Sequence, residues 1–292
     1  MDASGRERLK AEMNYPIAMI PYANMAPYAA LGPPEGCYFV ACTPRNSIQA
    51  LQSGAIWAAA VPVGGLAALA ETVEPVGLFG IAAYKEVMSV MFFSERPFDG
   101  FCRPQRVRLT DESASSVRLL YLLMGYQCGF DRIAEKSTVG ASANGDLVIG
   151  DTALHWLRLW EVQGEVKGYR FVTDLAAQWD QRHQLPFVFA RWVVRADAPQ
   201  RLKDNLRRWL ERFAAQEEAL IERSTPGVAS RLGLPQEYIR RYQKVIRRCL
   251  TDQDAAGQTR FQEEWRNHAA AGEAAWFQGL PGSAAPGGHS HG

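Results

Sequence analysis

Short apolar segments that alternate with short helical ones constrain the fold of this chain more than any other feature. The expected strands lie at residues 17–20, 37–42, 57–63, 77–81, 87–93 and 107–109. Helices are expected between some of them, near 47–52 and 66–71. Such alternation is typical of an α/β protein, in which helices cover a mostly parallel sheet. We therefore predict an α/β fold for the first third of the chain.

A second α/β stretch begins at Ser113. This serine is placed to cap a helix that ends at Gly125 or Gly129. The stretch then continues with a strand at 147–149, a helix capped by Asp151 and a strand at 186–194. Beyond it the pattern changes to long amphipathic helices, expected at 200–223, 236–250 and 255–267.

These segments suggest how the chain is divided. At about 100–200 residues per domain, a chain of 292 residues has room for two α/β lobes. We predict a first lobe at 14–105, a second at 106–190, C-terminal helices at 191–268 that pack on the first lobe, and a disordered Gly-, Pro- and Ser-rich tail at 269–292.

Charge and cysteine content exclude several classes of partner and site. Lys and Arg total 32 against 31 Asp and Glu, so no overall field favours nucleic acid or an anionic membrane. The five cysteines are scattered and form no C-x-x-C pair, which predicts free thiols rather than disulfides or a zinc site. Near the start, Pro16, Pro21 and Pro27 interrupt any signal-peptide core. We predict a soluble, cytoplasmic protein.

Familiar catalytic signatures are missing from the sequence. It has no G-x-S-x-G, no Walker A motif, no H-E-x-x-H and no G-x-G-x-x-G after a strand. Only His155, His183 and His268 lie in the region expected to fold. Neither a metal site nor histidine-based acid–base chemistry is therefore predicted.

Asn24 is the first candidate for a ligand contact. It follows the first expected strand in a loop flanked by Pro21 and Pro27, so its amide lies at the carboxyl end of a strand. Ligands of open α/β sheets bind at that edge. An asparagine that only closes a turn explains the same pattern, and on pattern alone is slightly favoured.

Three serines at the start of one helix are the second candidate. Ser113, Ser115 and Ser116 would offer hydroxyl and free backbone N–H donors to an anion such as a carboxylate. Plain N-capping by Ser113 is an equally good explanation, although it needs neither of the other two serines.

Two single polar residues complete the set. Ser89 stands alone in the apolar run 87–93, which places it either in the core, bonded to a backbone carbonyl, or at a cleft between lobes. Asp151 follows a strand and a glycine. A helix cap explains it best, and a catalytic base is the alternative. The basic segment 240–248 is expected to be a solvated helix face rather than a phosphate-binding surface.

Five segments follow one another in order: Tyr-Ala-Asn-Met-Ala-Pro at 22–27, Val-Met-Ser-Val at 87–90, the serine-rich helix start at 113–120, Ile-Gly-Asp-Thr-Ala-Leu at 149–154, and Asp-Leu…Trp…Leu-Pro-Phe-Val-Phe-Ala-Arg-Trp at 174–192. Taken together, they resemble the menaquinone biosynthesis family of the futalosine route, particularly its chorismate dehydratase branch. The last segment is the most specific. The resemblance covers residues 16–195, and the helical remainder is similar only in character.

The resemblance implies a periplasmic-binding-protein-like fold of type II, with two α/β lobes joined by hinge strands and the ligand between them. It also implies loss of water from chorismate, a small dicarboxylate, to give 3-[(1-carboxyvinyl)oxy]benzoate, with no cofactor. A monomer or homodimer is expected. Because the matched segments offer neutral groups and no obvious base, we expect the substrate's own carboxylate to take the proton while Asn24 and Ser89 orient it. Ser113, Ser115, Ser116 and Asp151 are expected to bind the substrate.

The chain also departs from the family pattern. Trp57, Pro62, Gly65 and Gln184 stand where other residues are common in the family, and each is expected near the cleft. They put the identity of the substrate in more doubt than the fold. Two alternatives follow: a non-catalytic binder of a small carboxylate, and the related branch that makes 1,4-dihydroxy-6-naphthoate. That branch uses a histidine, and the segment 149–151 has none.

Overall fold

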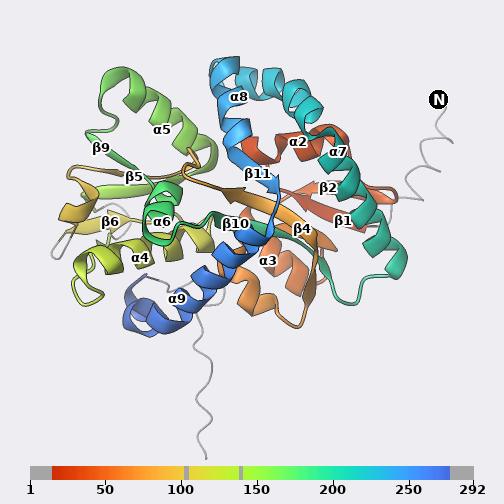
Figure 1. Cartoon of the computed structure of the whole chain (residues 1–292), viewed down its shortest axis with the longest axis horizontal. Helices are drawn as coiled ribbons and strands as arrows, with labels where there is room; N and C mark the ends of the chain where they lie inside the picture. Colours follow the sequence, from red (N-terminus) through yellow and green to blue (C-terminus); the bar gives the residue numbers. More distant parts are fainter. Residues whose placement is uncertain (1–14, 102–104, 138–140, 277–292) are drawn as a thin grey trace, which may run out of the picture.

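The apolar segments form two separate sheets (Figure 1) in a computed structural model that describes residues 15–101, 105–137 and 141–276. The first sheet has six strands in the order β11–β4–β10–β3–β1–β2. Its strands are β1 (Tyr15–Met19), β2 (Cys37–Ala41), β3 (Ala58–Pro62), β4 (Val73–Ala83), β10 (Phe187–Arg195) and β11 (Ile246–Cys249). All residues of β3 and nearly all of β10 are buried, because helices cover the sheet.

The second sheet has five strands in the order β7–β6–β8–β5–β9. They are β5 (Val90–Ser94), β6 (Arg106–Arg108), β7 (Glu135–Lys136), β8 (Gly145–Ile149) and β9 (Phe171–Asp174). The chain enters this sheet between β4 and β5 and returns to the first sheet between β9 and β10. The prediction of two α/β lobes is confirmed.

Both sheets are mixed, but four of the six strands of the first and four of the five of the second run in the same direction, so the strands are mostly parallel, as predicted. Strand β1 is parallel to β2 and β3, and β6 is parallel to β7 and β8. The strands β10, β11 and β5 run antiparallel to their neighbours. Strands β5 and β10 arrive from the other lobe, so each enters its sheet from the opposite end.

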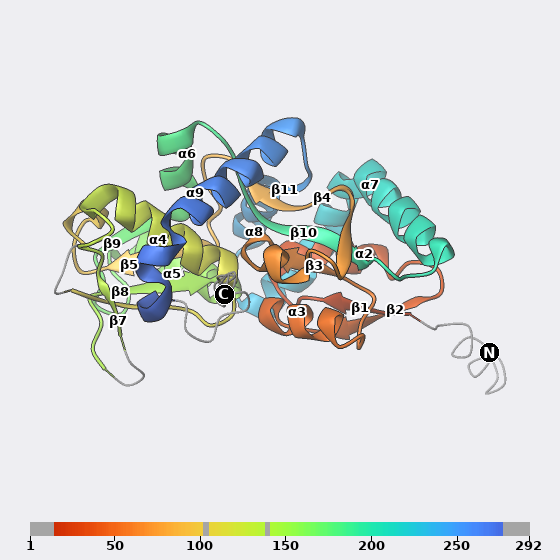
Figure 2. The same ribbon diagram turned by 90° about the horizontal axis from the view of Figure 1, so that it is seen from below.

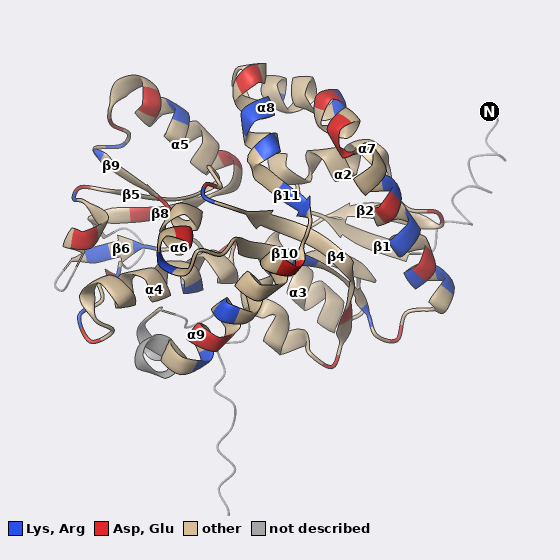
Figure 3. Cartoon of the chain, viewed as in Figure 1, with Lys and Arg blue, Asp and Glu red and all other residues tan. Residues whose placement is uncertain are grey.

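The helices surround the two sheets. They are α2 (Ala26–Leu31), α3 (Pro44–Gln52), α4 (Ala114–Cys128), α5 (Gly150–Gln163), α6 (Leu175–His183), α7 (Gln200–Leu232), α8 (Gln236–Val245) and α9 (Asp252–Trp276), with short 3₁₀ turns η1 (Ala23–Met25), η2 (Val63–Leu69) and η3 (Phe98–Gly100). As predicted, Ser113 caps α4, since its Oγ accepts from the Ser116 N–H at 3.2 Å, and Gly129 ends it. Acidic and basic residues are interspersed over both lobes (Figure 3).

The segment after α8 differs from its prediction as helix. Residues 246–249 form β11, which pairs with β4 at the edge of the first sheet. Ile246 and Arg248 are buried, whereas Arg247 is half-buried, a period of two that a helix does not produce. The basic residues of 240–248 therefore do not share one solvated face, because Arg248 is fully buried.

Helix α9 contacts both lobes (Figure 2), because it packs on α4 and β7 as well as on β10. It also continues to Trp276, beyond the start of the tail predicted at 269. The Trp276 ring is buried, and its Nε1 donates to the Ala134 carbonyl at 3.1 Å. A single large aromatic side chain thus anchors a segment whose small residues suggested disorder. Residues 277–292 lie outside the described part of the chain.

The chain changes sheet earlier than the predicted lobe boundary at 105/106. The crossings fall between Ala83 and Val90 and between Asp174 and Phe187. Strand β5 is as apolar as the strands of the first sheet, so its composition does not reveal which sheet it joins. In the described ranges no helix has both the length and the apolar character needed to span a membrane.

Candidate active site

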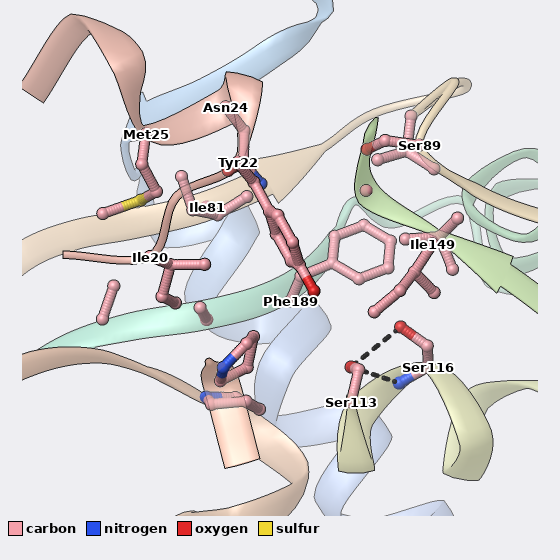
Figure 4. A pocket seen from close by; sticks show the side chains of 17 residues that line it. Ile20, Tyr22, Asn24, Met25, Ile81, Ser89, Ser113, Ser116, Ile149 and Phe189 are labelled. Carbon is pink, nitrogen blue, oxygen red and sulfur yellow. Dashed lines mark hydrogen bonds between the residues drawn. The ribbon is translucent and has the colours of Figure 1, made fainter. Parts of the chain in front are cut away.

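A pocket of about 580 Å³, including its open mouth, lies where the two sheets face each other (Figure 4). Its walls come from the ends of β1, β3 and β8, from β4 and β10, from the loop before β5 and from the start of α4. The lining residues are Ile20, Tyr22, Asn24, Met25, Pro44, Ala60, Pro62, Ile81, Val87, Ser89, Val90, Ser113, Ser116, Ile149, Gly150, Phe189 and Ala190.

Asn24 reaches this pocket from η1, immediately after β1. The turn is fixed through its backbone: the Asn24 carbonyl accepts from Arg248 Nε at 3.0 Å, and the Ala23 carbonyl accepts from Gln243 Nε2 at 2.5 Å. The Asn24 amide oxygen itself is buried and has no hydrogen-bond partner among the described residues. Buried polar atoms in proteins are nearly always paired, so this oxygen is available to a ligand.

Ser89 lines the pocket from the other lobe and is 3% exposed. Its loop is held by Asp174, whose Oδ2 accepts from the Val87 N–H at 2.8 Å and the Met88 N–H at 2.9 Å. The same carboxylate caps α6 through Oδ1. Burial raises the pKa of Tyr242, whereas its side-chain interaction with Ser89 lowers that pKa. Ser89 is therefore at the cleft, the second of its two predicted locations.

Ser113 and Ser116 face the same pocket from the first turn of α4. Their hydroxyl oxygens are 3.0 Å apart, and both residues are buried. Two hydroxyls at the positive end of a helix of 15 residues form a suitable environment for a carboxylate. The structure thus brings together Asn24, Ser89, Ser113 and Ser116 around one cavity.

Ser115 and Asp151 do not line the pocket. Ser115 Oγ donates to the Phe189 carbonyl at 3.0 Å and accepts from the Gly64 N–H at 2.9 Å, so it joins α4 to β10 and η2. Asp151 is not the cap of α5, which begins at Gly150 with Ile149 as its N-cap. The strand and the helix are directly adjacent, which places the carboxylate in the first turn instead.

The Asp151 carboxylate connects the two lobes. Its Oδ1 accepts from the Ala23 N–H at 2.8 Å, and its Oδ2 pairs with Arg231 of α7 at 2.6 Å. A second connection lies at the pocket itself, where the Tyr22 hydroxyl donates to Glu112 Oε2 at 2.5 Å. Burial and this bond to Glu112 raise the pKa of Tyr22 above its usual range. Sequence reasoning missed both contacts, because they join residues distant in the chain.

Of the four residues that depart from the family pattern, only Pro62 lines the pocket. Trp57 packs edge-on against Tyr15. Gln184 ends α6 in the left-handed conformation. At Gly65 a Cβ would overlap the end of the Ile48 side chain, so a larger residue there requires that side chain to move. Among the described residues, no group of His, Cys, Asp and Glu is arranged to hold a metal ion.

Arg248 is a site residue that the sequence analysis assigned to a solvated face. It is fully buried, and besides the Asn24 carbonyl it contacts Glu217 and the Gln243 carbonyl, each at 3.1 Å. A basic residue on a short strand after an amphipathic helix gives no clear signal of this role. The C-terminal section thus supports the turn that carries Asn24.

We predict that Arg248→Gln lowers the free energy of unfolding by about 3 kcal/mol, since it removes a fully buried guanidinium and leaves the Asn24 and Gln243 carbonyls without these donors. Arg201→Gln is the matched control. The Arg201 side chain is 80% exposed and pairs with Glu35, 70% exposed, so its loss is expected to change stability by less than about 1 kcal/mol. Urea unfolding followed by circular dichroism measures both, and equal effects would contradict the prediction.

Comparison with known proteins agrees with this geometry. The chain matches the family model described as menaquinone biosynthesis over residues 15–267. It is 29% identical over 270 residues to a chorismate dehydratase of Thermus thermophilus, and the alignment covers 85% of this chain and 94% of the relative.

Solved structures show the same fold at much lower identity. The periplasmic aliphatic sulphonate binding protein SsuA of Escherichia coli has a TM-score of 0.56 at 14% identity, with 88% of this chain and 87% of that chain covered. The alkanesulfonate-binding protein SsuA of Xanthomonas axonopodis pv. citri, bound to MOPS, has a TM-score of 0.60 at 12% identity, with 91% and 96% covered. The predicted periplasmic-binding-protein-like fold is confirmed, and the chain belongs to the menaquinone biosynthesis family.

Proposed function

We propose that this protein is a chorismate dehydratase, a hydro-lyase that converts chorismate to 3-[(1-carboxyvinyl)oxy]benzoate and water. The observation that carries the proposal is the lining of the pocket between the sheets. It presents an unpaired amide oxygen and three serine hydroxyls, and among the described residues of the lining only Tyr22 has an ionisable side chain. The relative from Thermus thermophilus, a chorismate dehydratase, supports the same assignment.

One carboxylate and the ring of chorismate each have a counterpart in the pocket. One carboxylate fits the first turn of α4, where the Ser113 and Ser116 hydroxyls and the helix N-terminus favour negative charge. The apolar ring fits against Phe189 and Ile149. Asn24 and Ser89 lie on opposite lobes, so a substrate between them is held from both sides.

The elimination breaks one C–H bond and one C–O bond. The proton leaves the ring carbon that carries the enolpyruvyl ether, its electron pair completes the aromatic ring, and the ring hydroxyl departs to form water. Tyr22 is a poor base, because the raised pKa keeps it protonated. We therefore infer that the side-chain carboxylate of the substrate accepts the proton, while Asn24 and Ser89 hold the reacting groups in position. The reaction involves no net oxidation, so it needs no redox cofactor.

Chromatography with mass detection tests this proposal. Purified protein incubated with chorismate is expected to consume it and to form the carboxyvinyloxybenzoate faster than the uncatalysed control. Ser89→Ala is expected to lower kcat about 100-fold, the effect of losing one preorganised polar contact. Ser53→Ala, at an exposed helix end, is the control and is expected to retain full activity.

Binding without conversion, seen as a thermal shift with chorismate but no product, would favour the non-catalytic carboxylate binder instead. Conversion of a later intermediate rather than chorismate would favour the naphthoate-forming branch. The proposal retains a cytoplasmic location and a monomer or homodimer as predictions. Gel filtration with light scattering would measure the oligomeric state.

A further inference from the structure

A second and larger cavity, of about 1,220 Å³ including open solvent, lies on the other side of α4 and β10 from the active-site pocket. Its walls come from η2, β4, β10, α4 and α9, and Figure 2 shows α9 lying across this region. The lining residues are Val63, Gly64, Leu66, Ala67, Ala70, Val73, Pro75, Arg118, Arg191, Val193, Gln258, Phe261, Gln262, Trp265 and Arg266. Three of these described residues are arginines, and none is acidic.

Arg191 is the key residue of this cavity. It is 8% exposed, and its guanidinium donates to the Gly77 carbonyl at 2.8 Å and to Gln258 Oε1 at 3.2 Å. Both acceptors are neutral, and Nε has no partner within the described ranges. No described carboxylate comes within ion-pair distance of it. Burial alone lowers the pKa of Arg191, as expected for a buried cation without a counter-charge.

Such an arrangement is unfavourable without an anion. A buried charge is strongly destabilising unless an opposite charge or a full set of hydrogen bonds compensates it. Arg118 brings a second guanidinium to the same cavity, 2% exposed and 4.7 Å above the Trp265 ring. Arg266 lies exposed at the rim. The electrostatic field in the cavity therefore favours an anion over a neutral or cationic ligand.

The remaining walls indicate the kind of anion. Phe261 and Trp265 supply aromatic surface, Val63 and Leu66 supply aliphatic surface, and Gln258 supplies an amide. A bare inorganic anion would leave this apolar surface uncovered. A carboxylate on a ring would pair with Arg191 and cover it. We propose that this cavity is a second binding site, specific for a small organic carboxylate whose apolar ring packs against Trp265.

The two cavities share their walls. Helix α4 presents Ser116 to the active-site pocket and Arg118 to the second cavity, and β10 does the same with Phe189 and Arg191. Ser115 holds these elements together through the Phe189 carbonyl. A ligand in the second cavity would therefore contact the elements that shape the first.

Titration calorimetry of the intact protein tests this proposal with benzoate and inorganic phosphate as probes. Benzoate is expected to bind, and at least about tenfold more tightly than phosphate. Arg191→Gln is expected to weaken benzoate binding by about tenfold or more, the effect of one charge-assisted hydrogen-bond partner. Without ligand its Tm is expected to equal or exceed that of the wild type, because the variant removes a buried unpaired charge.

Ala67→Trp is a second variant that keeps Arg191. Ala67 is exposed at the wall of the cavity, so a large ring there fills the space without disturbing the core, and benzoate binding is expected to be lost. If benzoate bound to both variants as tightly as to the wild type, the anion would occupy the active-site pocket instead, and the proposal would be overturned. Phosphate binding as tight as benzoate would overturn the carboxylate assignment, and no saturable binding of either would overturn the site.

Discussion

Asn24→Ala is expected to lower kcat for chorismate by about 100-fold or more while leaving the fold intact. The amide oxygen of Asn24 has no hydrogen-bond partner among the described residues. Removing this oxygen therefore breaks no hydrogen bond within the described protein. The turn itself is held through backbone carbonyls by Arg248 and Gln243, which the substitution does not touch. Steady-state kinetics and circular dichroism measure the two effects separately.

Asn46→Ala serves as the matched control, because Asn46 is exposed on α3 and is not among the residues that line the pocket. Its kcat is expected to equal that of the wild type. Asn24→Asp separates orientation from proton transfer. It places a carboxylate beside a dianionic substrate and is expected to be as inactive as Asn24→Ala. If it instead matched the wild-type rate, a protein base would be competent at this position, and the substrate-assisted proton transfer would be wrong.

Gly257→Ala is expected to destabilise the protein by about 3 kcal/mol or more, as overpacking against rigid backbone does. Gly257 lies in α9 against the backbone of Pro186, just before β10, and a Cβ there would overlap the Pro186 carbonyl oxygen. That oxygen belongs to the main chain and has no alternative rotamer. Either α9 or the start of β10 must therefore move. Urea unfolding with the midpoint and slope both fitted measures the loss.

Gly227→Ala supplies the opposite case in the same protein. Gly227 lies within α7, and a Cβ at this position meets no atom within 4 Å. Alanine favours the helix over glycine, so the substitution is expected to raise stability by about 0.5–1 kcal/mol. If Gly257→Ala and Gly227→Ala changed the free energy of unfolding by the same amount in the same direction, the contact with Pro186 would not limit the packing of α9.

Local sequence signals predicted the parts of the site that depend on local geometry. Ser113 caps its helix as predicted, because the cap needs only a serine before an apolar helical run. Asn24 lies in a turn after β1, as its flanking prolines indicated. Strand β5, which directly follows Ser89, and strand β10, which carries Phe189, were recognised from their apolar runs. Each of these features is determined within about ten residues of chain.

Features that depend on distant partners could not be predicted in the same way. Arg248 followed an amphipathic helix and was assigned to its solvated face, yet its partners Asn24 and Glu217 are far away in the chain. Asp151 has the same sequence context as an N-cap, and only the position of Ala23 in the other lobe explains its contacts. The anchoring of Trp276 requires Ala134 at the edge of the second lobe.

The position of β10 between β3 and β4 has a consequence for how the protein is made. A ribosome adds about 5–20 residues per second, so β3 and β4 emerge on the order of ten seconds before the strand that joins them. During that interval the nascent first sheet presents unpaired strand edges, which are templates for association with other chains. The second lobe is encoded between these strands and completes its sheet first. Yield in the cell should therefore depend on chaperones that shield the early strands until β10 is synthesised.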